Sequence, residues 1–255
     1  MYTSGLSVSE FVLAADDGLH MLGIVQGGSV FHVGLLQALV YESRELTATT
    51  RAHQQVRRLA LSRLEQEAAR LGAHGVLGVS FRQRPVGTDG LEFWAAGTAV
   101  RLTQGEPPPR PFLCTLSGTE FWTLRRAGYR PCGVALGVCA AYHVASQPLR
   151  NLRVSRQRRD IGRKGVGGME YAEYTEAVQS ARQTALDRLA AGAAQGLAEG
   201  VINIQVEQSV APPTLDDSNV YRRFDLLIRC VALGTAIAAH RDRWPLIDQA
   251  VPLDT

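Results

Sequence analysis

One stretch of the chain occurs twice and decides the fold. Residues 71–79 read LGAHGVLGV and residues 196–204 read GLAEGVINI, an offset of 125 positions (200 − 75) between their central glycines. Three further landmarks recur in the same order, at offsets of 110, 111 and 137: residues 6–11 with 116–121, 31–33 with 142–144, and 96–99 with 233–236. Four ordered matches indicate an internal duplication.

The duplication divides the 255 residues, whose composition alone allows one large domain or two small ones. We predict a first domain over residues 1–103 and a second over 116–240. The linker between them, 104–115, contains a proline run typical of an extended spacer, and residues 241–255 form a tail. Because the offset increases twice within the second copy, we place insertions there, at 150–166 and 210–221.

Both copies show the same order of expected elements. Two short strands separated by a turn glycine are followed by a long helix, whose apolar residues recur every three or four positions, and by two more strands. In the second copy the first two strands are expected at 121–125 and 130–141, and a short helix at 33–41 precedes the first long helix. The predicted fold class is α+β: two tandem β-β-α-β-β domains, each a small antiparallel or mixed sheet with one long helix packed on it.

Composition excludes several classes of protein. A content of 45% hydrophobic and 20% charged residues, with a net charge of +3, is typical of a globular protein rather than a disordered or fibrous one. The longest apolar run, 231–239, is far shorter than the roughly 20 residues of a membrane-spanning helix. The N-terminus lacks the features of a signal peptide, so we expect a cytoplasmic protein with four reduced cysteines.

The sequence contains none of the catalytic motifs considered below, so the motifs do not favour an enzymatic function. The glycine-rich segment 162–168 lacks the Ser or Thr that follows lysine in a phosphate-binding loop, because Lys164 is followed by Gly165. The sequence also has no nucleophile elbow and no His-Glu-x-x-His zinc motif. We therefore predict a non-enzymatic protein without a cofactor, a bound metal ion being the alternative.

The repeated stretch, with the strand ending AGTAV at 96–100, resembles the YbjQ-like family, for which heavy-metal binding has been proposed. The segments GIVQG at 23–27 and GGMEY at 167–171 are similar to other parts of that family. The resemblance implies a small domain that assembles into a pentameric ring, so we expect a homo-oligomer of five chains, as two stacked rings in preference to ten domains in one ring. Three residues depart from the family pattern. Asn203 stands where the family has glycine, and His74 and Glu199 stand at the equivalent position just before the third strand of each copy.

Metal binding has one local candidate, formed by Cys132, Cys139 and His143. Cys139 and His143 share strand parity, and thiolate and imidazole groups suit zinc or a softer metal. A Cys-x₆-Cys spacing is not a zinc pattern, however, and cysteines in so apolar a segment commonly lie in the core. Both interpretations stay open.

Two histidines, His32 and His143, recur in both copies. Repeated around a ring they would form a cluster that titrates near neutral pH. The alternative is a structural histidine held by hydrogen bonds at the end of a strand.

The first insertion is strongly basic. Its arginines and lysine could contact the phosphates of a nucleic acid, an acidic partner or carboxylates of a neighbouring subunit. No aromatic residues alternate with them, which disfavours single-strand stacking and makes nucleic acid the weaker alternative. These residues are Arg150, Arg153, Arg156, Arg158, Arg159, Arg163 and Lys164.

The tail carries Trp244, Leu246 and Ile247, which are better suited to docking on a neighbour than to chemistry. The sequence thus favours an oligomeric, ring-forming scaffold or adaptor within a larger assembly. The alternative is a module that binds a heavy metal or another small ligand.

Overall fold

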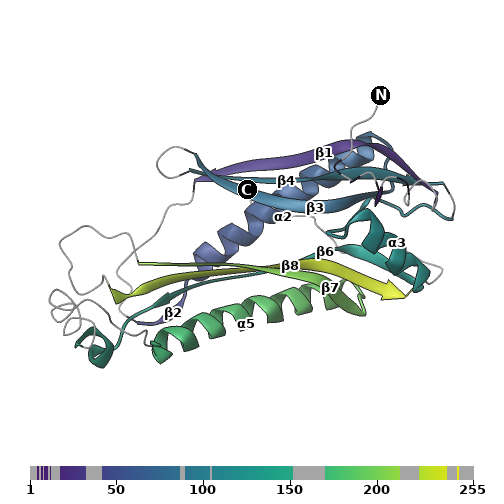
Figure 1. Ribbon diagram of the computed structural model, residues 1–255. Coiled ribbons are helices and arrows are strands. Elements are labelled where there is room, and N and C mark those ends of the chain that lie inside the picture. Colours follow the sequence, from purple (N-terminus) through teal and green to yellow (C-terminus); the bar gives the residue numbers. More distant parts are fainter. Residues whose placement is uncertain are drawn as a thin grey trace.

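A computed structural model gives the arrangement of both copies. It describes residues 18–32, 42–86, 90–103, 105–151, 170–212 and 224–239, together with residues 5, 7, 9, 10, 12 and 246. Within these ranges the strands form two four-stranded sheets, each accompanied by a long helix (Figure 1).

The first sheet belongs mainly to the first copy. Its strands lie in the order β1 (Leu19–His32), β4 (Gly90–Leu102), β3 (Gly75–Val86) and β5 (Phe112–Leu113). Neighbouring strands are antiparallel, except that β5 runs parallel to β3. Helix α2, Thr47–Arg70, packs mainly against β1 and β4 of this sheet.

The second sheet consists of three strands from the second copy and β2 (Arg44–Glu45), a short strand from the first copy. Its order is β2, β6 (Tyr129–His143), β8 (Leu226–Ala239) and β7 (Gly200–Ala211), all antiparallel. Helix α5, Ala172–Gln195, packs against β6, β8 and β7. The predicted fold class is therefore confirmed, with one sheet and one long helix for each copy.

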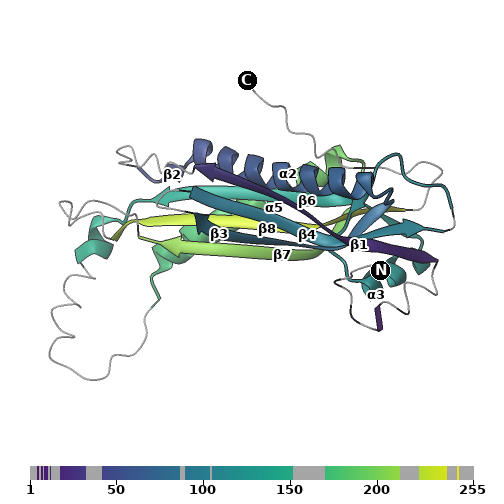
Figure 2. The same cartoon turned by 90° about the horizontal axis from the view of Figure 1, so that it is seen from above.

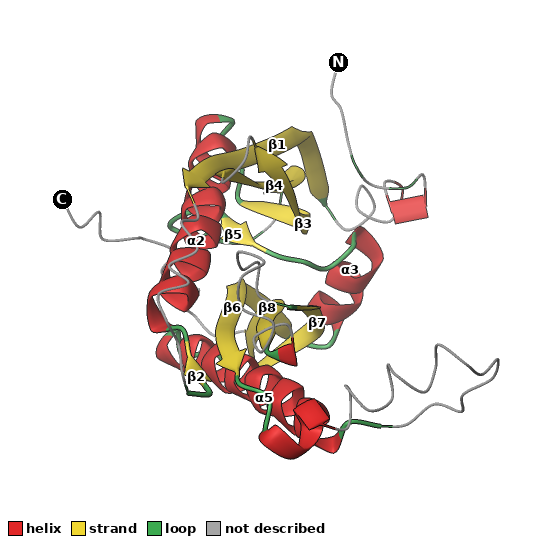
Figure 3. Ribbon diagram, turned by 90° about the vertical axis from the view of Figure 1, so that its left-hand side faces the viewer, coloured by secondary structure: helices red, strands yellow, loops and turns green. Residues whose placement is uncertain are grey.

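Helix α2 bridges the two sheets along one flank, and the short helix α3, Gly118–Arg126, lies on the opposite flank (Figure 3). Seen from above, α2 runs alongside β1 with β2 near its first turn (Figure 2). Helix α2 contacts β6 as well as β1, so it belongs to the cores of both halves. No helix in the described part of the chain is long and apolar enough to cross a membrane.

The two halves share structural details as well as topology. A Cβ atom on Gly27 would overlap the carbonyl oxygen of Ala60 in α2, and one on Gly137 would overlap that of Ala185 in α5. These glycines are 110 positions apart and the alanines 125 apart, the offsets found in the sequence. Each long helix thus crosses its own sheet at an equivalent glycine.

The departure at Asn203 has a simple structural explanation. Gly78 and Asn203, 125 positions apart, lie at matching irregularities of β3 and β7 and have φ angles of 64° and 51°. Asparagine adopts this left-handed conformation more readily than other side chains do, so it can replace the glycine there.

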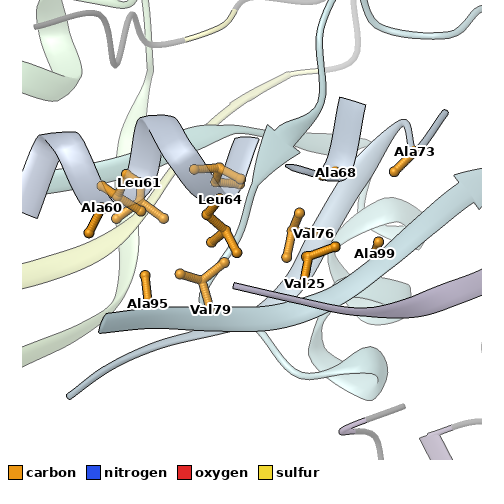
Figure 4. Close-up of a cluster of buried hydrophobic side chains, with 12 residues drawn as sticks. Val25, Ala60, Leu61, Leu64, Ala68, Ala73, Val76, Val79, Ala95 and Ala99 are labelled. Carbon is orange, nitrogen blue, oxygen red and sulfur yellow. The ribbon is translucent and has the colours of Figure 1, made fainter. Parts of the chain in front are cut away.

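The main core lies where α2 meets the first sheet (Figure 4). Leu61 and Leu64 of α2 pack with Val25 of β1 and Val79 of β3. Val134 of β6 belongs to the same cluster, so this core continues into the second half.

The first predicted strand of each copy is wrong: in the first copy Val12, which this prediction places in a strand, is helical. Residues 121–125, expected as a strand, belong to helix α3. The Ser117 side chain accepts a hydrogen bond from Glu120 N, and the Glu120 side chain accepts one from Ser117 N, a capping box that starts a helix. The short helix expected at 33–41 lies outside the described residues, and the predicted linker contains strand β5.

Candidate assembly interface

Each half completes the sheet of the other. From the first half, β2 pairs with the edge of β6, and just beyond it Leu46 N donates to Ala140 O at 2.8 Å. The first turn of α2 fixes the same edge, because Ala140 N donates to Thr50 Oγ1 at 2.9 Å. These bonds satisfy edge groups of β6 that would otherwise be open to pairing with another strand.

The exchange is reciprocal, because β5 adds to the edge of β3. Phe112 N donates to His74 O at 3.1 Å and Cys114 N donates to Val76 O at 3.0 Å. Strand β5 leads directly into the second half. The contact between the two repeats, called the joint below, therefore consists of two strand additions: β2 of the first repeat joins the second sheet, and β5 joins the first sheet.

An ion pair fastens the first of these additions. The two terminal guanidinium nitrogens of Arg188 in α5, Nη1 and Nη2, donate to the Glu45 carboxylate at 2.6 and 2.8 Å, and Nη1 also donates to Val138 O at 2.8 Å. The bonds from Arg188 lower the pKa of Glu45, and those to Glu45 raise the pKa of Arg188. Such two-pronged geometry fixes orientation as well as charge.

Helix α2 also places two cationic or titratable side chains, Arg57 and His53, between the two sheets. Arg57 is buried, its guanidinium carbon lies 4.4 Å from the centre of the Phe93 ring, and its Nη2 donates to Gln83 Oε1. Burial lowers the pKa of Arg57 to about 10, although Glu207 on β7 opposes this shift. His53, one turn earlier, is 4% exposed.

His53 predicts a pH dependence of stability. Burial, followed by the charges of Arg57 and Arg229, lowers its pKa from 6.5 to about 4. The unfolded chain therefore takes up a proton below pH 6.5 that the folded chain rejects until about pH 4, so stability falls as the pH drops between these values. We expect a loss of about 2 kcal/mol from this group between pH 7 and pH 5. Denaturant unfolding of the parent and of His53→Gln at both pH values measures it, and equal pH dependences would contradict it.

The two sheets differ in how well the face opposite their own helix is covered. In the second sheet Val134 and Ala140 on β6 lie at the joint and are 1% and 0% exposed. At the matching positions of β1, 110 residues earlier, Ile24 and Val30 are 49% and 60% exposed. The first sheet thus leaves open the face that the second sheet buries.

The three metal candidates all lie on β6. Cys132 and Cys139 are buried in the cluster under α5, and burial raises their pKa to about 12 and about 11. At about 3.3 Å per residue, the four-residue separation of Cys139 and His143 exceeds 10 Å, so they cannot bind one ion within the chain. No metal-binding group of three His, Cys, Asp or Glu side chains occurs among the described residues. Metal binding remains a prediction for metal analysis of the purified protein.

Of the repeated histidines, His143 can be described. Its Nε2 lies 2.9 Å from Glu173 Oε1, and its Nδ1 lies 3.4 Å from Ser43 Oγ. Glu173 also accepts hydrogen bonds from Ser146. The surroundings of His143 are those of a structural histidine at a strand end. His32 is the last residue of β1, and its side chain lies outside the described residues.

Of the seven basic residues of the insertion, Arg150 falls within the described residues, and its Nη2 donates to Asp225 Oδ1 at 3.0 Å. The other six basic residues, Trp244 and Ile247 lie outside them. Leu246 packs against the cluster that contains Phe121, so this part of the tail docks on its own chain. Whether the basic loop and the tail reach a partner stays a prediction.

Sequence reasoning missed Glu45, Arg57 and Arg188, the charged residues of the joint. The duplication carried a signal that could have found them. At the offset of 125, Glu45 aligns with Glu170, Arg57 with Arg182, and Arg63 with Arg188.

The fold and the joint define a tandem-repeat α+β protein in which each repeat completes the sheet of its neighbour. The chain belongs to the YbjQ family, described as "Putative heavy-metal-binding"; the family model matches residues 17–103 and 142–240, one region in each repeat. This confirms the resemblance and the tandem arrangement.

Two relatives match this chain over different lengths. The encapsulin nanocompartment protein Rv1762c of Mycobacterium tuberculosis is 34% identical over 210 residues, which cover 80% of this chain and 76% of that protein. A UPF0145 protein of Thermus thermophilus is 41% identical over 87 residues, covering 32% of this chain and 76% of that protein. The first similarity extends over both repeats, and the second has the length of one.

Proposed function

We propose that this chain is a cytoplasmic, non-enzymatic scaffold that assembles with further copies of itself into a closed ring. One observation carries the proposal: the first repeat gives strand β2 and a face of helix α2 to the second sheet, whereas α5, the matching helix of the second repeat, packs against the strands of its own sheet. Helix α2 is buried against two sheets, including at Thr50, His53 and Arg57. The described residues of α5 that are buried lie on one stripe, Ala181, Ala185, Leu189 and Ala193.

The joint between the repeats is heterologous, because the surface that the first repeat presents differs from the surface of the second that receives it. Repeated contacts of this kind form a closed ring when the rotation per step closes, and a filament when it does not. The family resemblance implies five chains, and continuity of the joint favours a single ring in which first and second repeats alternate.

The names of the relatives agree with a structural role. None of them refers to a reaction, and the Mycobacterium tuberculosis relative is named for a nanocompartment. A ring of this protein would fit a role as a scaffold or adaptor attached to a larger protein assembly.

The mass in solution tests the proposal. We expect light scattering at micromolar concentration to give a defined multiple of the 27.7 kDa chain, with five chains as the expected number. The mass should hold over a tenfold dilution, as for a closed ring. A single-chain mass throughout would overturn the proposal, and a mass that increases continuously with concentration would indicate a filament instead.

A further inference from the structure

The first sheet carries a groove along the edge formed by β1. It has a volume of about 900 Å³, and its floor includes Gly28 and Val30 of β1 with Trp94 and Glu92 of β4. These positions pair across the strands, Gly28 with Trp94 and Val30 with Glu92. Arg63 of α2 forms part of the wall and donates to Gly28 O.

The same place in the second sheet is filled. There the remaining cavity is about 130 Å³, and its lining includes Val138, Ala140 and Val231, which match Gly28, Val30 and Trp94 at offsets of 110 and 137. His53 and Arg57 of α2 lie against these positions. The groove therefore lies at the position where, in the second sheet, helix α2 of the other repeat is bound.

We infer that the groove receives helix α5 of a second copy of this chain, and that Glu170 of that copy binds Arg63. The inference rests on the proposed ring and names the contact that would close it. Within one chain, Glu45 of the incoming segment binds Arg188 beside Val138 O. Glu170 matches Glu45 and Arg63 matches Arg188, both at 125 positions, and Arg63 already binds Gly28 O, the counterpart of Val138 O.

The local geometry at Glu170 is that of Glu45. Thr175 Oγ1 donates to Glu170 Oε1 at 2.9 Å, and Thr50, which matches Thr175, hydrogen-bonds Glu45 and lowers its pKa. Both glutamates are thus held by the threonine five residues later, in the first turn of the helix that follows. Glu170 is exposed in the single chain, where a second copy can reach it.

The charges that line the groove are exchanged relative to the second sheet. The groove has Arg82 and Glu92 where the second sheet has Glu207 and Arg229. Each surface thus carries one carboxylate for the arginine that both long helices have at the matching position, Arg57 of α2 and Arg182 of α5.

Charge reversal tests the contact. Glu170→Arg and Arg63→Glu should each weaken the joint between copies by about tenfold or more, seen as dissociation at higher concentration in light scattering. The double variant should regain much of the parent's mass. Glu106→Arg, a reversal at an exposed linker position, is the matched control and should leave the mass unchanged.

A cross-link gives an independent result. Because the four native cysteines are buried, Arg63→Cys combined with Glu170→Cys should form disulfides between copies on mild oxidation and give a ladder of linked chains on a non-reducing gel. If the parent is oligomeric but the reversals keep its mass and no ladder forms, the inference is wrong and the ring proposal survives. If the parent is a single chain, both are overturned.

Discussion

Replacing Gly137 by valine is expected to lower the free energy of unfolding by about 3 kcal/mol. An added Cβ would overlap the Ala185 carbonyl oxygen and would lie 2.6 Å from Leu189 N, both of which are helix backbone atoms. No change of rotamer can relieve such an overlap, so α5 must move away from β6 and lose packing in the second core. Thermal and denaturant unfolding followed by circular dichroism measure this loss.

Gly192→Ala is the matched control, because it changes another glycine in the same half. Gly192 lies within α5, and the nearest atom to an added Cβ is Leu136 O at 4.0 Å. Alanine should therefore fit there and stabilise the helix by up to about 1 kcal/mol. If Gly137→Val unfolds at the same denaturant concentration as the parent, the close helix crossing is wrong.

Replacing Asp225 by alanine should be more damaging than most changes in the chain. Asp225 is 1% exposed and accepts hydrogen bonds from Tyr142 Oη at 2.8 Å, Ala145 N at 2.9 Å and Arg150 Nη2 at 3.0 Å. Removing the carboxylate leaves these three donors without their acceptor and the Arg150 charge without its ion-pair partner. Breaking a buried pair in this way costs about 3–5 kcal/mol, measurable by denaturant unfolding.

The double variant Asp225→Ala with Arg150→Met separates the ion pair from the other hydrogen bonds. Removing the cation as well should recover part of the loss, since no unpaired charge then remains. A loss below about 1 kcal/mol in Asp225→Ala would contradict the role given to this network.

The duplication made most of the fold predictable. Repeated glycines and apolar residues at helical spacing placed both long helices and the main strands, because these signals are local. Helix α3 was missed because Phe121, Trp122 and Leu124 also suit a strand, whereas the signal for a helix is the capping pair of Ser117 and Glu120 just before them. The strand exchange was missed because β2 and β5 have two residues each, too few for any periodic pattern.

The candidate site was harder to predict than the fold. Residue chemistry drew attention to Cys132, Cys139 and the basic loop, since cysteines and arginine clusters stand out in composition. The residues of the joint, Glu45 in β2 and Arg188 in α5, are 143 positions apart, and charged residues of these types are common on protein surfaces. Their pairing depends on one repeat docking on the other, which is a tertiary property.

Particle images of the purified protein test the central claim most directly, because they show whether each first repeat meets the second repeat of another chain. The account predicts a closed ring with two domain-sized units per chain, in which α5 of every chain lies against the first sheet of the next. Images of isolated chains, or of an assembly in which α5 does not contact the first sheet of another chain, would contradict it.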